Sequence, residues 1–247
     1  MFTTTEREKV RTSLIQAAQK DDRITGGALT GSASVGKEDR WSDIDLAFGV
    51  RAGVDKYAPL ESFTKMMYRK HGALHHLDVF SSEWIYRAFL LDNTLQVDLA
   101  FVSEEGFRPT ARTFKLLFGK AVFDGLLVGY PDSDKMIGMA WLYALHVRSC
   151  IKRNNVWQAE HMISGMRNEV LKLACLRHKL PVMHGRGYDQ LPSKVTRPLE
   201  SSLVKSLSPK DMKSAFRATT NALVREIRYV DGKLAEKLER ALRALTR

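Results

Sequence analysis

The chain has 247 residues, of which 44% are hydrophobic and 27% charged, and its formal net charge is +11. This composition is ordinary for a soluble globular protein, and the lack of any run of 18 apolar residues excludes a membrane-spanning helix. The first residues lead into a charged amphipathic segment and not a signal peptide, and both cysteines lie among apolar neighbours. We therefore expect a cytoplasmic protein with reduced cysteines and no membrane partner.

The charge is unevenly distributed along the chain. Residues 1–125 contain 17 basic and 17 acidic side chains, whereas residues 126–247 contain 22 basic and 11 acidic ones. The whole positive excess therefore lies in the second half. Such an excess favours an anionic partner, such as nucleotide phosphates or nucleic acid, although charged helix faces turned to solvent would give the same count.

The first half mixes helical and strand patterns. We predict a helix to about Lys20, a loop or short helix over 34–40, a helix ending at Lys70, a short helix around Thr113–Phe118 and a turn at Asp124-Gly125. Strands are predicted over Ile24–Leu29, Asp43–Val50, Leu74–Phe80 and, as a hairpin around Asp92-Asn93, over two further β-rich runs.

The second half has helical patterns throughout. Helices are predicted over Ser133–Arg153, Val156–His178, Asp211–Val230 and Lys233–Leu245, with a proline- and glycine-containing loop over residues 181–198. The predicted fold is thus α/β (α+β), with a mixed sheet and flanking helices over 1–125 followed by a C-terminal helical bundle over 126–247.

One stretch carries most of the chemical information. Gly31-Ser32 is followed after ten residues by Asp43-Ile44-Asp45, within an apolar run. On a strand, residues two apart project from the same face, about 6–7 Å from each other. Two carboxylates at this separation repel each other unless a cation lies between them, so the pattern favours a metal site over its alternative, a surface hairpin with an acidic edge.

A third acid fits the same site. Asp98 lies between Val97 and Leu99 in an apolar strand, where an unpaired carboxylate is costly, and a metal shared with Asp43 and Asp45 would compensate it. Asp78, in Leu77-Asp78-Val79, is the alternative third carboxylate.

The Gly31-Ser32 and Asp43-x-Asp45 pattern resembles the signature of the polymerase β-type nucleotidyltransferases. The two-part layout is similar to that of bacterial aminoglycoside and lincosamide adenylyltransferase-like proteins, in which a helical domain closes the nucleotide site. This resemblance implies that Asp43, Asp45 and Asp98 hold two Mg²⁺ ions and that ATP is the co-substrate. It also implies that Gly31 and Ser32 hold the β- and γ-phosphates.

Further candidates come from polar positions outside this motif. Lys37 is available near the phosphates, and Lys194 and Arg197, in the 181–198 segment, are candidates for clamping the triphosphate. Glu160, on one polar side of the 156–178 helix, is the best candidate for orienting or deprotonating an acceptor. A polar helix face turned to solvent is the alternative explanation of Glu160.

These features predict transfer of a nucleoside monophosphate to a hydroxyl of a small molecule, such as an antibiotic. The basic second half argues against a polycationic aminoglycoside, so an uncharged or anionic acceptor is equally plausible. Two alternatives stay open: a nucleotidyltransferase acting on RNA or protein, and a catalytically idle nucleotide-binding module.

Overall fold

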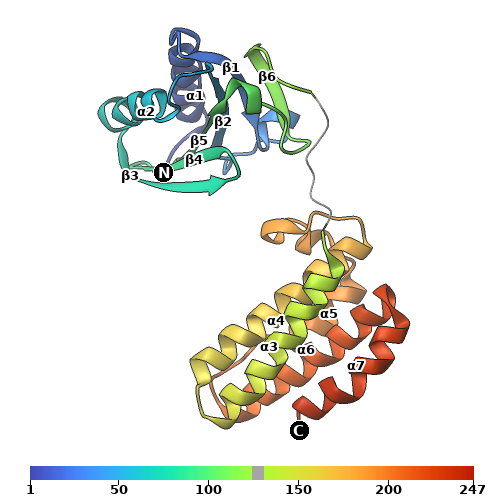
Figure 1. Cartoon of the computed structure of the whole chain (residues 1–247). Coiled ribbons are helices and arrows are strands. Elements are labelled where there is room, and N and C mark those ends of the chain that lie inside the picture. Colours follow the sequence, from blue (N-terminus) through green and yellow to red (C-terminus); the bar gives the residue numbers. More distant parts are fainter. Residues whose placement is uncertain (124–130) are drawn as a thin grey trace. The chain divides into compact units, whose positions relative to one another are not determined.

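The computed structural model describes residues 1–123 and 131–247, and it divides into two compact units, Met1–Gly129 and Tyr130–Arg247. The first unit is built around a sheet and the second is helical (Figure 1). This arrangement confirms the predicted fold class of a mixed sheet with flanking helices followed by a helical region. The predicted turn at Asp124-Gly125 and the predicted domain boundary after residue 125 lie outside the described residues.

The first unit contains a six-stranded sheet with the strand order β3-β4-β5-β2-β1-β6 among the residues that the structure describes. Strands β2 and β5 are parallel and the other neighbours are antiparallel. The helices are α1 (Thr4–Gln19) and α2 (Tyr57–Lys70), and the strands are β1 (Ile24–Thr30), β2 (Ile44–Val50), β3 (Ala73–Ser81), β4 (Trp84–Leu91), β5 (Gln96–Ser103) and β6 (Phe114–Gly119). Short 3₁₀ turns are η1 (Ala33–Val35) and η2 (Glu104–Gly106).

Helices α1 and α2 pack against one face of this sheet. Phe48 on β2, Phe63 on α2 and Phe101 on β5 form an aromatic cluster with ring centroids 5.3–5.6 Å apart. The opposite face has a smaller core centred on Phe107, which is buried against Ala28, Ala47, Ala100 and Val102. Only part of that second face is covered in this way, and its remaining part carries the candidate site described below.

The predicted short helix around Thr113–Phe118 is wrong, because these residues form β6, which pairs antiparallel with β1. Six residues are too few to make a stable helix alone, whereas an edge strand gains its hydrogen bonds from a neighbour. A glycine on β1 leaves the space that β6 needs. A Cβ atom at Gly27 would collide with the Phe118 ring, so only glycine allows that ring to lie against β1.

The second unit packs its long helices around one apolar core formed mainly by α3, α4 and α6, with α7 along one side. Its helices are α3 (Ser133–Lys152), α4 (Val156–Arg177), α5 (Ser193–Glu200), α6 (Pro209–Val230) and α7 (Gly232–Leu245). Helix α7 begins at the predicted break, where the Asp231 side chain accepts a hydrogen bond of 3.0 Å from the Leu234 N–H.

The predicted loop over residues 181–198 is wrong in part. It contains two 3₁₀ turns, η3 (Met183–Gly185) and η4 (Tyr188–Gln190), and most of helix α5. Prolines made this segment resemble a loop, but Pro192 stands at the N-cap of α5, where it does not interrupt the helix. Val195 and Leu199 are buried and attach α5 to its unit.

Cys150 and Cys175 are free and buried in the helical unit. Among the described residues, no helix combines the length and apolar character needed to cross a membrane.

Candidate active site

The structure brings three aspartates together at one end of the sheet. Asp43 directly precedes β2, Asp45 lies on β2, and Asp98 lies on the parallel neighbour β5, directly opposite Asp45. Asp43 and Asp45 are two residues apart and therefore lie on one side of the strand. One carboxylate oxygen from each of the three residues lies within 4.8 Å of the other two. This spacing and an all-oxygen donor set fit a hard divalent cation such as Mg²⁺.

The rival acid, Asp78, lies on the other face of the sheet. It is opposite Arg87 on β4, and the Arg87 guanidinium donates two hydrogen bonds, of 2.6 and 2.7 Å, to its carboxylate. Arg87 also donates to Glu61 and Thr64 on α2, so this ion pair belongs to the helix-covered side. These hydrogen bonds hold the pKa of Asp78 below its usual value. Asp78 is thus part of a structural ion pair.

The electrostatic environment of Asp98 has the opposite effect to that of Asp78, because it raises the pKa of the carboxyl group. Burial raises its pKa from 3.8 to about 6, and the charge of Asp43 acts in the same direction. The Gln96 amide opposes this shift by donating hydrogen bonds of 3.1 and 2.9 Å to the two Asp98 oxygens. A cation held between the three carboxylates would favour the ionised form of Asp98.

Gly31 is required by the position of Asp45. It follows β1 with a φ of +59°, a conformation that favours glycine. A Cβ atom at this position would overlap the Asp45 carboxylate, so any other residue at position 31 would displace that group. The turn that follows is held by the Ser34 hydroxyl, which donates to the Gly31 carbonyl at 2.8 Å, and by the Lys37 N–H, which donates to the Ser32 carbonyl at 3.0 Å. The Ser32 side chain is half-buried and does not cap η1.

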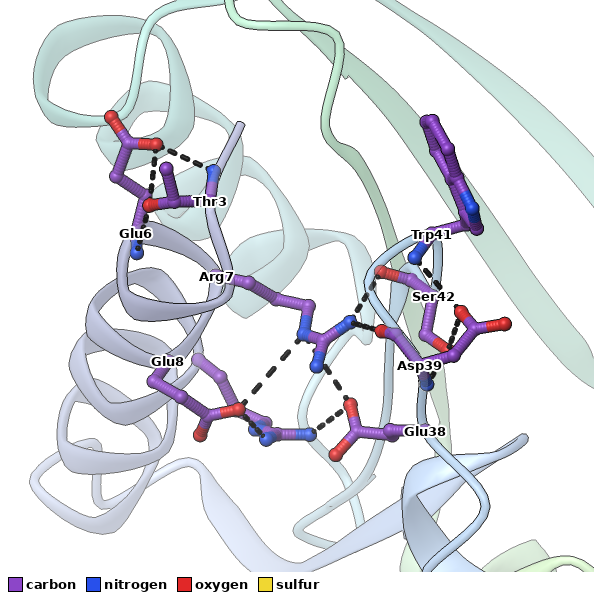
Figure 2. Close-up of polar contacts among 9 residues, drawn as sticks. Thr3, Glu6, Arg7, Glu8, Glu38, Asp39, Trp41 and Ser42 are labelled. Carbon is purple, nitrogen blue, oxygen red and sulfur yellow. Dashed lines mark hydrogen bonds and ion pairs between the residues drawn. The ribbon is translucent and has the colours of Figure 1, made fainter. Parts of the chain in front are cut away.

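The loop that leads into Asp43 is attached to α1 by a buried arginine (Figure 2). Arg7 is 4% exposed, and its Nη1 donates hydrogen bonds of 2.6 Å to the Asp39 carbonyl and 3.0 Å to the Ser42 carbonyl. Ser42 is the residue before Asp43, so Arg7 fixes the backbone from which the first carboxylate projects. One turn further along α1, Arg11 pairs with Glu38 in the same loop at 2.7 Å and also contacts Glu8.

Sequence reasoning did not identify Arg7. A signal for it does exist, because the buried positions of α1 are Arg7, Arg11, Leu14 and Ala18, which follow the spacing of a single helix face. Arginines on the apolar face of a helix need internal partners, which are two backbone carbonyls for Arg7 and the carboxylates of Glu38 and Glu8 for Arg11.

Of the remaining candidates, Lys37 belongs to the first unit, and Lys194, Arg197 and Glu160 belong to the helical unit. Lys37 is exposed just after Gly36. Lys194 is exposed on α5 with Arg197, in the helical unit. Glu160 accepts a hydrogen bond of 2.6 Å from Ser164, and Arg167 donates to Ser164 at 2.9 Å and to the Ser202 carbonyl at 3.0 Å. Glu160 thus ends a polar network on α4, and its role toward an acceptor stays a prediction.

No protein-family model and no curated protein matches this chain. Among solved structures, it is similar to an aminoglycoside 6-adenyltransferase from Bacillus subtilis at 15% identity, covering 97% of this chain and 98% of that one with a TM-score of 0.44. It is also similar to a nucleotidyltransferase-like protein from Exiguobacterium sibiricum 255-15 at 16% identity, with 95% and 80% covered and a TM-score of 0.40. Similarities this distant assign no activity to the chain, whose chemistry follows from its own residues.

Proposed function

We propose that this protein is a Mg²⁺-dependent nucleotidyltransferase that transfers a nucleoside monophosphate, from ATP, to a hydroxyl of a small molecule. The observation that carries the proposal is the convergence of Asp43, Asp45 and Asp98, with carboxylate oxygens within 4.8 Å of one another. Three carboxylates this close repel one another, and a cation bound between them would relieve the repulsion. The glycine turn beside them, at Gly31, exposes backbone to an anionic substrate.

In the proposed reaction the acceptor hydroxyl attacks the α-phosphorus, its proton is released, and the bond to pyrophosphate breaks. Two Mg²⁺ ions would neutralise the charge that develops on the attacking and leaving oxygens. Asp43 and Asp45 would hold both ions, and Asp98 would hold the one nearer the acceptor. Gly31 and Ser32 would position the β- and γ-phosphates, with Lys37 and Lys194 as further phosphate ligands. Glu160 is the proposed residue for orienting the acceptor hydroxyl.

Release of pyrophosphate from each of the four ribonucleotides, measured against a panel of hydroxyl-bearing acceptors including antibiotics, tests this proposal. We expect Asp45→Asn to reduce turnover at least about 10³-fold while the fold persists. Asp22→Asn, which neutralises an exposed acid in the same unit, is the matched control and should retain activity. A well-folded and fully active Asp45→Asn enzyme would contradict the proposal.

One observation favours RNA as an alternative acceptor. A groove of about 520 Å³ on the helical unit is lined by seven residues, three of them basic: Ser201, Lys210, Lys213, Ser214, Arg217, Ala218 and Asn221. If this surface binds a nucleic-acid backbone, affinity should fall steeply as salt increases, and exchanging Lys213 for Gln should reduce the slope. Transfer to an uncharged small molecule should depend only weakly on salt.

A further inference from the structure

An apolar strip continues the carboxylate site across the sheet. Residues paired in register on neighbouring strands project from the same face. Leu77 on β3 pairs with Ala88 on β4, Ala88 pairs with Asp98 on β5, and Asp98 pairs with Asp45 on β2. Neighbouring strands are about 4.8 Å apart, so Leu77 lies about 10 Å from Asp98 along this row.

The strip is exposed in the first unit. Leu77 is 63% exposed and Leu90, which also projects from this face, is 52% exposed. Helices α1 and α2 cover the opposite face, and the Phe107 core covers a different part of this one. Large apolar side chains exposed beside a polar site commonly mark a place where a ligand is bound.

A hollow occupies this strip and ends beside Gln96. Its volume is about 340 Å³, and its lining residues are His75, His76, Leu77, Ala88, Phe89, Leu90 and Gln96. Gln96 joins the two regions, because it lines the hollow while its amide donates hydrogen bonds to both oxygens of Asp98. Gln96 therefore lies between the hollow and the candidate metal site.

We propose that this hollow binds the acceptor, and that the acceptor is an uncharged molecule with an apolar ring about 10 Å from its reacting hydroxyl group. The inference rests on the proposed nucleotidyl transfer and specifies its substrate class. None of the residues lining the hollow is Asp, Glu, Lys or Arg, so it offers no carboxylate to a polycation and no lysine or arginine to a phosphate. A ring resting on Leu77 and Leu90 places a hydroxyl about 10 Å away at Asp98, which is the length of a two-ring compound.

The size of the hollow favours a small molecule over a protein. A volume of about 340 Å³ is within the range of ligand pockets, which starts near 300 Å³. A stable protein partner would need about 800 Å² on each side, far more than these few side chains provide.

The test uses three acceptors of defined chemistry with the full-length protein: 4-methylumbelliferyl β-glucoside, which joins an uncharged ring to hydroxyls, glucose, which lacks the ring, and kanamycin, a polycation. Each is titrated into protein saturated with Mg²⁺ and a non-hydrolysable ATP analogue, and methyl chemical shifts are followed. The variants Leu77→Asn and Leu90→Asn assign the two leucine signals. Pyrophosphate release from ATP is measured with the same acceptors.

We expect the aryl glucoside alone to shift both leucine signals saturably and to support pyrophosphate release. Leu77→Asn should raise its KM about tenfold and leave kcat and nucleotide affinity unchanged. Phe80→Asn is the matched control, because Phe80 is on the same strand and also 63% exposed but projects from the helix-covered face with Ile85. This variant should behave like the wild type.

The inference is overturned if kanamycin or glucose is preferred, if the aryl glucoside shifts neither signal, or if Leu77→Asn changes the oligomeric state and not the KM. A protein that binds no Mg·ATP and releases no pyrophosphate with any acceptor contradicts the proposed function itself, and the inference with it. A protein that binds Mg·ATP and modifies acceptors regardless of Leu77 contradicts only the inference.

Discussion

The two faces of the sheet each carry an acid in the middle of a strand, and they compensate it in different ways. On the helix-covered face, Asp78 is bound through both oxygens by Arg87. On the other face, Asp98 has the neutral Gln96 amide as its hydrogen-bond donor and two further carboxylates beside it. The first environment lowers the pKa of the acid and the second raises it.

This contrast separates an acid that is paired within the fold from an acid that belongs to the candidate metal site. Asp78 has a cation within the fold, so its charge contributes to holding β3, β4 and α2 together. On the other face, burial and the charge of Asp43 raise the pKa of Asp98, so the ionised form of Asp98 costs stability in the metal-free protein. Each face can be disturbed separately.

The largest expected effect is on activity and comes from Gly31→Ala. The new Cβ would overlap the Asp45 carboxylate and displace it from the cluster. We expect turnover to fall about 10³-fold, as for the loss of a metal ligand, with the Asp78–Arg87 pair unaffected. Gly36→Ala is a close control, because Gly36 also has a positive φ, of +66°, but no atom lies within 4 Å of its added Cβ. Equal loss of activity in both variants would attribute the effect to backbone strain and refute the steric explanation.

The next effect is on stability and comes from Arg87→Met. Removing the buried guanidinium leaves Asp78 and Glu61 without their cation, which should lower the free energy of unfolding by about 3 kcal/mol. Denaturant titration measures this loss. The bidentate but more exposed pair of Arg23 and Asp21 is the comparison, and Arg23→Met should cost less than about 1 kcal/mol. Similar losses in the two variants would show that burial adds nothing to the pair.

Much of this contrast between Asp98 and Asp78 could be predicted from the local sequence pattern. The period-two spacing of Asp43 and Asp45 placed both on one side of a strand, and the cost of burying Asp98 placed its strand beside theirs, as the parallel pairing of β2 and β5 confirms. Strand register places Asp98, and not Asp78, on the face that carries Asp45, a difference that the sequence alone left open. Pairing Asp78 with Arg87 rather than with Ala88 sets it on the helix-covered face, and such register depends on long-range contacts.

The wrong prediction for residues 114–119 and the failure to identify Arg7 have the same cause, since both depend on contacts between residues far apart in the sequence. Residues 114–119 form a strand only because β1 offers an edge and Gly27 leaves room for Phe118. The place of Arg7 depends on two carbonyls more than 30 residues away in the chain, at Asp39 and Ser42. The local sequence therefore predicts neither the strand over residues 114–119 nor the hydrogen bonds of Arg7.

A smaller effect is expected from Asp98→Asn in the metal-free protein. The pKa of Asp98 is raised from 3.8 to about 6, so between these values the folded state binds more protons than the unfolded state. The wild type should therefore lose about 1–2 kcal/mol of stability as pH rises from about 4 to 6, and the variant should not. At pH 7 the variant should thus be more stable, although inactive.

Thermal unfolding at several pH values measures this difference. Added Mg²⁺ should stabilise the wild type at pH 7 and leave Asp98→Asn nearly unchanged, since the cation would bind the folded protein through the three carboxylates and the variant lacks one of them. A wild type whose stability is flat between pH 4 and 6, relative to the variant, would contradict the assigned pKa shift.

The smallest effect is expected from Arg7→Lys, which alters only the support of the loop that leads into Asp43. The new lysine has one ammonium nitrogen in place of the planar guanidinium. It should therefore hold the carbonyls of Asp39 and Ser42 less firmly than arginine does. The loop before Asp43 then becomes more mobile, and we expect Mn²⁺ affinity, measured by calorimetry, to fall about three- to tenfold. Arg11→Lys, one turn along the same helix, keeps both carbonyl contacts and should bind Mn²⁺ as the wild type does. If both variants lose affinity equally, the loop is held by the ion pairs to Glu38, and the backbone hydrogen bonds from Arg7 do not position Asp43.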